Sequence, residues 1–533
     1  MKNKRQYLPK DFEPNEWELI HPFFEELKSR PINSKEEFKK WLLDRSELEA
    51  AISENAGWRY IRMTCDTTNE KLTDSFNYFL SEIQPKIAPY TNSLNEKALN
   101  SPYLEQINEA GFEILKKTLE KDFKIFREEN IPLLTEIEQE AHTYGSISGA
   151  MTVEVEGKEL TLQQAGDYLQ SSDRQIREDV WRKISSRRYQ DHQKLDELFD
   201  KLVKLRHQVA LNADYGNYRD YMFTSLGRFE YTAEDCFAFH NAIAKEVVPI
   251  QKSLAEERKA RLNVASLNPW DLQVNYYSST PLKPFENGEE LLEKTIECFY
   301  QIDKYLGDCL VKMKEMGHLD LVSRKGKAPG GYNYPLDETG VPFIFMNATS
   351  TLRDLVTMVH EGGHALHSFL TKDLELTVFK HPPSEVAELA SMSMELISME
   401  HWDVFFKNEK DLIRARREHL ESIIQTLPWV STIDKFQHWI YTNPGHTIDQ
   451  RKKEWANIFT QFDNQVTSWD GLENYKEYVW QKQLHLYEVP FYYIEYGMAQ
   501  LGAVAVWKNY KSNREEGYRK YVEALKLGYT API

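Results

Sequence analysis

The sequence predicts a mainly α-helical protein with a few short strands. Stretches rich in Lys, Glu and Leu repeat apolar residues every three or four positions, as amphipathic helices do, over roughly 70–90, 104–142 and 173–212. Two segments instead favour strands, Met151–Leu162 and Pro342–Asn347. The 533 residues suffice for a large core, so we expect two or three lobes or one large helical unit.

The first clear helix start is at Ser34. In S-K-E-E-F-K-K-W-L-L, the serine is followed three residues later by Glu37, which is the pattern of a capping box. Helical periodicity then continues to Trp58. The charged faces of this helix and of those that follow it indicate scaffold rather than a site.

One hairpin is predicted in the first half of the chain. Met151–Leu162 alternates apolar and polar residues about a turn at Glu156 and Gly157, and we favour a purely structural role for it. The next helix is expected to cover Asp173–Leu211 without interruption, and Leu211–Tyr218 is expected to be a loop.

Charge and cysteine usage restrict the classes of partner. The formal net charge is −17 with no prominent basic face, which argues against nucleic acid and anionic membranes as partners. The N-terminus lacks the apolar run of a signal peptide, and no stretch approaches 18 consecutive apolar residues. We therefore expect a cytoplasmic protein, in which these widely spaced cysteines are free thiols: Cys65, Cys236, Cys298 and Cys309.

The segment V-H-E-G-G-H-A-L-H, Val359–His367, predicts a metal site. On a helix, His360 and His364 are four residues apart and project from one face, as two nitrogen ligands of one zinc ion must. Glu361 then lies beside the open coordination position. The alternative is a histidine pair that is solvated or satisfied in the core, but H-E-x-x-H arises by chance in only roughly 0.04 of sequences of this composition.

The surroundings of this motif indicate a buried helix. Apolar residues recur at helical spacing on both sides of it: Leu352, Leu355, Val356, Val359, Leu366 and Phe369. Gly362 and Gly363 lie within the helix, where each costs roughly 1 kcal/mol relative to alanine. We expect that another group, such as the backbone of a substrate, approaches the helix closely there.

A second helix offers a third ligand. Pro383–Leu396 is predicted to be helical and capped by Ser384, and it carries Glu385, Glu388 and Glu395. Glu388 and Glu395 are seven residues apart and share one face. A catalytic zinc takes three protein ligands and keeps an open site, and two histidines with a glutamate are a known set. Without the zinc helix, a solvated face would explain these acids equally well.

An aromatic segment near the C-terminus, His485–Gly497, offers hydrogen-bond donors. Pro490 suits the first turn of a helix, after which Tyr492 and Tyr496 share a face. Together with the imidazole of His485, these phenol groups can donate to a developing oxyanion. The alternative is that the segment is aromatic core.

These residues together resemble the zinc oligopeptidases of the oligoendopeptidase F and thimet oligopeptidase group. In that group a glutamate ligand follows the H-E-x-x-H helix by about two dozen residues, and Glu388 follows His364 by 24. The resemblance implies that His360, His364 and Glu388 bind one Zn2+ per chain. It also implies that Glu361 is the general base and that Glu395 supports a ligand.

The resemblance extends to two further segments. Gly330–Asn347, G-G-Y-N-Y-P followed by P-F-I-F-M-N, is similar to the strand beside which the family binds its peptide substrate, and we expect Phe343–Asn347 to provide the backbone hydrogen bonds. The aromatic segment is similar as well, which implies that His485, Tyr492 and Tyr496 are candidates for stabilising the oxyanion.

The resemblance also implies a fold and a division of the chain. The fold would be a zincin-like one of the gluzincin type, with two helical lobes around a deep substrate channel and short strands near the zinc site. We assign residues 1–200 to an N-terminal helical lobe with the hairpin, and residues 201–533 to a catalytic lobe that carries the zinc helix.

The predicted function is that of a zinc-dependent metalloendopeptidase that hydrolyses short peptides. Zinc and Glu361 would activate water for attack on the scissile carbonyl. One alternative is a dipeptidyl carboxypeptidase-type exopeptidase, which needs a cation for the terminal carboxylate of its substrate. Another is a non-catalytic peptide-binding protein, which would not need Glu361. The sequence favours neither a monomer nor a homo-oligomer.

Overall fold

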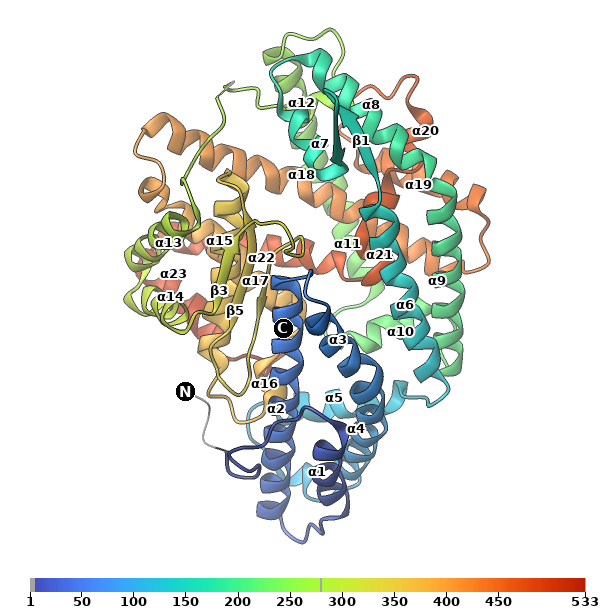
Figure 1. The fold of residues 1–533 in the computed structure, drawn as a ribbon, viewed down its shortest axis with the longest axis vertical. Coiled ribbons are helices and arrows are strands. Elements are labelled where there is room, and N and C mark those ends of the chain that lie inside the picture. Colours follow the sequence, from blue (N-terminus) through green and yellow to red (C-terminus); the bar gives the residue numbers. More distant parts are fainter. Residues whose placement is uncertain (1–4, 279, 533) are drawn as a thin grey trace. The chain divides into compact units, whose positions relative to one another are not determined.

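Helices dominate the structure, a computed structural model that describes residues 5–278 and 280–532 (Figure 1). The chain forms two compact units. The first contains Met1–Phe126, Leu282–Ala415 and Met498–Ile533, and the second contains Arg127–Pro281 and Arg416–Gly497. The mainly helical fold class is confirmed. The substrate channel stays a prediction. The domain boundary at residue 200, which lies inside a helix of the structure, also stays a prediction.

The N-terminal part of the first unit is a helical layer around an aromatic and aliphatic core that includes Phe24, Phe38 and Trp41. Ser34 caps its longest helix by accepting a hydrogen bond from the Glu37 amide at 3.1 Å. The predicted capping box is incomplete, because the Glu37 carboxylate accepts from the Asn33 amide instead. The helices are α1 (Trp17–Ser29), α2 (Lys35–Cys65), α3 (Glu70–Tyr78), α4 (Gln84–Leu99) and α5 (Phe112–Ile125).

The remainder of the first unit surrounds a three-stranded sheet of order β3-β5-β4. The central strand β5 pairs in parallel with β3 and antiparallel with β4, and it packs against α15, which lies beside it in Figure 1. The elements are α13 (Gly288–Ile302), α14 (Lys304–Met316), β3 (Leu319–Val322), β4 (Tyr332–Tyr334), β5 (Phe343–Ala348), α15 (Leu352–Thr371), α16 (Thr377–Lys380), α17 (Ser384–Met399) and α23 (Arg514–Lys526).

A buried lysine stabilises an irregular part of this sheet. The register between β3 and β5 shifts between Asp320 and Val322. The fully buried ammonium of Lys327 donates to the Asp320 carboxylate at 2.8 Å, to the Asp320 and Val322 carbonyls at 3.0 and 3.1 Å, and to the Met346 carbonyl. Burial alone would raise the pKa of Asp320, but hydrogen bonds from Arg324 and Lys327 outweigh it and lower that pKa to about 2.

We expect Lys327→Met to lower the free energy of unfolding by about 3–5 kcal/mol, because it removes a fully buried ammonium that donates to the Asp320 carboxylate and to three carbonyls. Arg324→Met removes the more exposed partner of Asp320 and should cost less than about 1 kcal/mol. Midpoints of chemical unfolding measure the difference. Equal losses in the two variants would show that Lys327 has no special role in the sheet.

The second unit contains the predicted hairpin. Strands β1 (Thr152–Val155) and β2 (Lys158–Thr161) are antiparallel, and Glu156 and Gly157 form the turn with φ of 51° and 74°. The hairpin is therefore confirmed. The other helices of this unit are α6 (Asn130–Gly149), α7 (Leu162–Gly166), α8 (Arg174–Gln190), α9 (His192–Asn212), α10 (Tyr218–Ser225), α11 (Ala233–Ala242), α12 (Val248–Arg261), α19 (Ile448–Phe462), α20 (Glu473–Lys476) and α21 (Leu484–Glu488).

The helix predicted over Asp173–Leu211 is two helices, so that prediction was wrong in one respect. The break between α8 and α9 falls at Asp191, whose carboxylate forms ion pairs with Arg187 and Lys194. Two of the boundaries between the units fall within helices, one in α18 (Glu409–Thr442) after Ala415 and one in α22 (Tyr493–Ser512) after Gly497.

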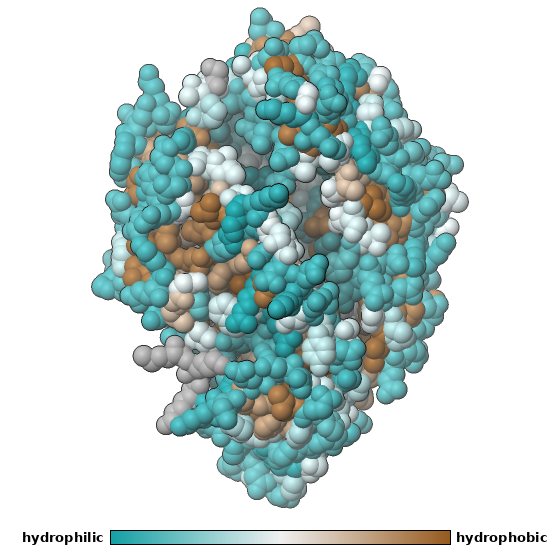
Figure 2. All heavy atoms as spheres, in the orientation of Figure 1, coloured by the Kyte–Doolittle hydropathy of each residue, from teal (hydrophilic) through white to brown (hydrophobic). Residues whose placement is uncertain are grey.

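The visible surface is mostly hydrophilic, with hydrophobic residues in small groups (Figure 2). No helix within residues 5–278 and 280–532 combines the length and the apolar character that crossing a membrane requires.

Candidate metal centre and active site

The helix that carries the motif starts at a complete capping box. Thr351 is the N-cap of α15, and its hydroxyl accepts a hydrogen bond from the Asp354 amide at 3.3 Å. The Asp354 carboxylate accepts in return from the Thr351 amide at 2.9 Å and from the Thr349 amide at 2.8 Å. Asp354 therefore acts at the start of the helix and does not support a metal ligand.

The two glycines of the motif allow neighbouring helices to approach α15. A Cβ on Gly363 would lie 2.7 Å from Ser391 Cα and 2.8 Å from the Ala390 carbonyl oxygen, both in the backbone of α17. A Cβ on Gly362 would lie 2.6 Å from the ring of Phe299 on α13. The expectation that another group approaches the helix closely here is confirmed, but the groups are α17 and α13 and not the backbone of a substrate.

The close contact with α17 brings the predicted ligands together. His360 Nε2 lies 3.4 Å and His364 Nε2 lies 3.7 Å from Glu388 Oε2. Donors about 2.0–2.1 Å from one tetrahedral ion lie about 3.3 Å from each other, so these side chains fit such an ion with little rearrangement. Two imidazoles and a carboxylate form one of the two ligand groups found among the described residues.

Another carboxylate orients one of the histidines. Glu395 Oε1 lies 2.6 Å from His360 Nδ1, which leaves Nε2 of that ring directed at Glu388. Such a partner fixes the tautomer of a metal ligand. The helix α17 begins after Pro383, and Ser384 makes no capping hydrogen bond, so the predicted cap was wrong. Glu385 is buried on the same helix but is not part of the ligand group.

The carboxyl group of Glu361 is buried beside the ligands. Its Oε2 has no hydrogen-bond partner among the described residues, whereas the backbone of Asn333 on β4 forms a hydrogen bond with the carboxyl group. Burial raises the pKa of Glu361 to about 7, and the charge of Glu388 adds to this effect. This carboxyl oxygen is thus available to accept a proton, because no donor among the described residues bonds to it.

The two histidines have opposite pKa shifts. Burial lowers the pKa of His364 to about 4, so its imidazole is neutral and ready to bind a metal. Burial also disfavours protonation of His360, but hydrogen bonds to Glu388 and Glu395 outweigh it and raise the pKa of His360. Metal binding must therefore displace a proton from His360, which makes the affinity depend on pH. A third histidine, His367, is buried toward α23 and is not part of the ligand group.

The donor candidates His485, Tyr492 and Tyr496 lie together in the second unit. The ring centroids of Tyr492 and Tyr496 are 5.2 Å apart, and that of His485 is 5.9 Å from Tyr496. The prediction that Pro490 lies in the first turn of a helix was wrong. Pro490 lies in the link between α21 and α22. The next residue, Phe491, has a φ of 67° and is fixed by a hydrogen bond from its amide to Gln437 at 2.7 Å.

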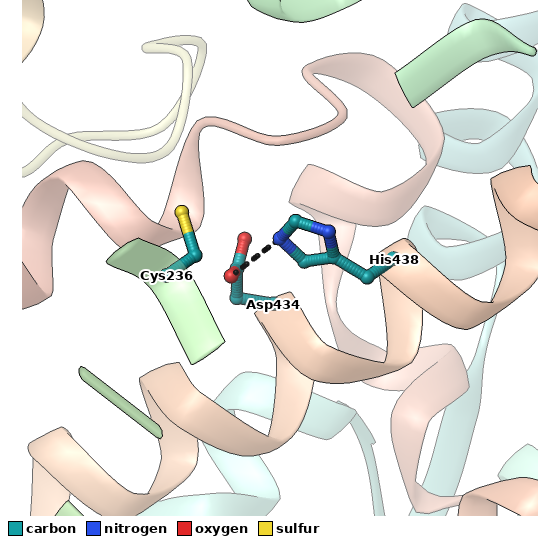
Figure 3. Close-up of side chains that lie close together, drawn as sticks. All are labelled: Cys236, Asp434 and His438. Atoms are coloured by element: carbon teal, nitrogen blue, oxygen red, sulfur yellow. Dashed lines mark ion pairs between the residues drawn. The ribbon is translucent and has the colours of Figure 1, made fainter. Parts of the chain in front are cut away.

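A second candidate ligand group, which the sequence analysis missed, is buried in the second unit. Figure 3 shows the Asp434 carboxylate between the thiol of Cys236 on α11 and the imidazole of His438 on α18. His438 Nε2 lies 3.2 Å from Asp434 Oδ2, and His240 Nε2 lies 2.9 Å from the same oxygen. These contacts outweigh burial and hold the pKa of Asp434 well below its usual range. The Asp434 carboxylate thus already has imidazole partners without a metal.

We therefore expect one metal ion per chain. The Asp434→Asn variant should retain the metal content of the parent and should lose only stability, because a buried polar network is broken. Elemental analysis of the two purified proteins measures this. Two ions in the parent and one in the variant would identify the group around Asp434 as a metal site.

Two models of peptidase families match parts of this chain. A model described as Peptidase family M3 matches residues 168–533, and one described as Peptidase M3 N-terminal domain matches residues 9–126. An oligoendopeptidase F homolog of Borreliella burgdorferi is 23% identical over 504 residues, which is 90% of this chain and 80% of the relative. The oligopeptidase PepF of Bacillus subtilis is 22% identical over 345 residues, which is 60% of this chain and 51% of the relative.

Solved structures agree with these matches. The structure of PZ peptidase A with an inhibitor is 27% identical, with a TM-score of 0.91, and covers 99% of this chain and 94% of that protein. The first family model alone spans more than half of the chain and includes the helices α15 and α17. The resemblance predicted from the sequence is confirmed, and the chain is a peptidase that belongs to family M3.

Proposed function

We propose that this peptidase is a zinc-dependent endopeptidase that cleaves short peptides. The observation that carries the proposal is the group formed by His360, His364 and Glu388 next to the unpartnered carboxyl oxygen of Glu361. Two nitrogen donors and one carboxylate favour zinc and leave a coordination position open. The names of the oligopeptidase relatives support peptides as the substrate class.

The reaction divides between the metal and the side chains. A zinc ion held by His360, His364 and Glu388 would supply a Lewis acid that polarises the scissile carbonyl and favours ionisation of the attacking water. Glu361 accepts the proton of that water and later donates it to the leaving amine. Glu395 holds the His360 ring in the orientation that its ligand role requires.

The edge of the three-stranded sheet offers a place for the peptide backbone. We expected Phe343–Asn347 to form the hydrogen bonds, but β5 pairs with a strand on each side. The strand β4 is at the edge, and its Asn333 backbone contacts Glu361. We therefore assign backbone recognition of an extended peptide to β4, which would fix the register without selecting one sequence.

The oxyanion is assigned to donors from Tyr496, Tyr492 and His485. We expect Tyr496→Phe or Tyr492→Phe to lower kcat about 100- to 1,000-fold with little change in KM, because a donor to the oxyanion acts mainly in the transition state. Tyr493→Phe is the matched control, since its ring also lies beside His485, with centroids 4.9 Å apart. If neither of the first two variants loses more activity than the control, the donors lie elsewhere.

The test of the proposed function is mass spectrometry of a pool of short peptides blocked at both ends. Internal cleavage that a chelator abolishes and added zinc restores is the expected result. Intact blocked peptides with trimming of unblocked ones would instead identify the exopeptidase alternative. If neither blocked nor unblocked peptides are cleaved despite bound zinc, the protein is a non-catalytic peptide-binding protein. The cytoplasm remains the compartment we propose, because none of the four cysteines, all of which the structure describes, forms a disulfide.

A further inference from the structure

The main-chain groups of Asn333, at the centre of the edge strand β4, face the open edge of the three-stranded sheet. The register pairs Asn333 with Ile344 of β5. The Ile344 amide donates to the carbonyl of His318, the residue just before β3, at 3.0 Å. Because the N–H and C=O groups of one strand residue point to the same side, Ile344 bonds toward β3 and not toward β4. The N–H and C=O groups of Asn333 therefore point away from β5.

The outward N–H group of Asn333 already has an acceptor. The Asn333 backbone forms a hydrogen bond with the Glu361 carboxyl group that acts to lower the pKa of that group. Only a donor favours the charged carboxylate, so the bond comes from the amide N–H. Two residues further on, Pro335 has no N–H group. A peptide added to this edge therefore meets no free main-chain donor for its carbonyl at the position of Asn333.

The tyrosines on either side of Asn333 show which face of the sheet its side chain occupies. The Tyr332 hydroxyl lies 2.6 Å from Thr64 Oγ1 on α2. A Cβ on Gly57, also on α2, would lie 2.5 Å from the ring of Tyr334. Both tyrosines thus face α2. Since successive side chains of a strand alternate, the side chain of Asn333 lies on the opposite face.

That opposite face packs against α15, the helix of the metal centre. Gly331, two residues before Asn333, is on the same face, and a Cβ there would lie 3.4 Å from Thr357 Cγ2 on α15. Thr357 is one helical turn before Glu361, so both are on the side of α15 that meets β4. The side-chain amide of Asn333 and the carboxyl group of Glu361 therefore lie on the same side of the edge strand.

The donor atom of the Asn333 amide is buried without a partner. In the part of the chain that the structure describes, Asn333 Nδ2 has no hydrogen-bond acceptor. A buried NH2 group without an acceptor costs free energy, which a ligand carbonyl would offset. The free side-chain donor and the missing main-chain donor occur at one position of β4.

We propose that the side chain of Asn333 donates a hydrogen bond to a backbone carbonyl of the peptide bound along β4. It replaces the main-chain amide that Glu361 occupies. The inference rests on the proposed function and names a substrate-binding residue for it. The scissile carbonyl is assigned to zinc, so Asn333 binds the carbonyl of a neighbouring peptide bond that does not react. Such a contact is equally strong in the ground state and in the transition state, and it contributes to binding and not to the chemical step.

The test is the Asn333→Leu variant, because leucine is close to asparagine in shape and cannot donate. With a peptide blocked at both ends, we expect KM to rise about 10-fold and kcat to change by less than about twofold. Asn92→Leu is the matched control. Asn92 Oδ1 is also buried without a partner among the described residues, but Asn92 lies on α4 in the N-terminal helical layer. This variant should keep the KM of the parent.

Two further measurements separate a direct contact from a structural role. Asn333→Leu should unfold at the same temperature as the parent or higher, because it removes a buried amide group that has no partner. Peptides that carry a single thioamide locate the carbonyl, because sulfur accepts hydrogen bonds more weakly than oxygen. One thioamide position should raise the KM of the parent and leave the KM of Asn333→Leu unchanged.

The outcomes distinguish this inference from the proposed function. An unchanged KM, a loss confined to kcat, or a rise in KM that accompanies a lower unfolding temperature would overturn the inference and leave the endopeptidase proposal intact. If the parent cleaves no blocked peptide, the proposed function fails, and binding of the same peptide decides the inference. The zinc-loaded Glu361→Gln protein should then bind the peptide about 10-fold more tightly than the double variant with Asn333→Leu. Equal affinities would overturn the inference.

Discussion

Replacing Glu361 with glutamine will lower kcat about 1,000- to 10,000-fold and leave the bound metal in place. Glutamine has nearly the same shape as glutamate, but its amide cannot accept the proton of the attacking water. The Glu361 oxygen that lacks a partner has no other role in the described structure. The loss should therefore appear in the chemical step and not in folding.

This expectation is measured by single-turnover cleavage of a blocked peptide, together with metal analysis and thermal unfolding. Glu385→Gln is the matched control, because that residue is a buried glutamate on α17 outside the ligand group. A Glu361→Gln protein that keeps more than a tenth of the parent activity would rule out Glu361 as the general base.

Replacing Glu388 with alanine will remove the metal and with it all activity that depends on the metal. Two imidazoles remain in that variant, and a zinc site with only two protein ligands falls short of the three that catalytic sites use. Glu395→Gln should behave differently, because Glu395 contacts His360 Nδ1 and not the metal position. We expect it to weaken zinc binding 10- to 100-fold while the protein remains active at high zinc.

Titration with a competing chelator separates the two variants. The assignment of Glu388 as a ligand would be refuted by zinc affinity unchanged from that of the parent. If Glu395→Gln lost the metal as completely as Glu388→Ala, Glu395 would be a ligand itself.

The parts of the structure that were predictable from the sequence depend on local spacing. A four-residue interval on one helix aligns His360 with His364, and a glycine turn between alternating residues specifies the hairpin at Glu156 and Gly157. The break at Asp191 was missed although it is local, because the helical periodicity continues on both sides of it.

The parts that were not predictable depend on contacts between distant segments. The order of the sheet, which makes β3 and β4 the edge strands and β5 the central strand, is set by pairing between segments that are distant in the sequence. The space next to Gly363 could be assigned to α17 only once that helix was placed. The group around Asp434 joins α11 to α18, and only the four-residue interval from Asp434 to His438 could have indicated it in the sequence.

The contact between Gly363 and the backbone of α17 links the metal centre to chain packing. A single methyl group added at this position would lie 2.7 Å from Ser391 Cα, a distance that real Cβ atoms essentially never show. The backbone there cannot turn aside as a side chain can, so α17 would have to shift as a whole and carry Glu388 and Glu395 with it. The lack of a side chain at Gly363 thus allows α17 to pack at the distance that the metal centre needs. The geometry of the ligands is therefore determined partly by a residue that offers no ligand.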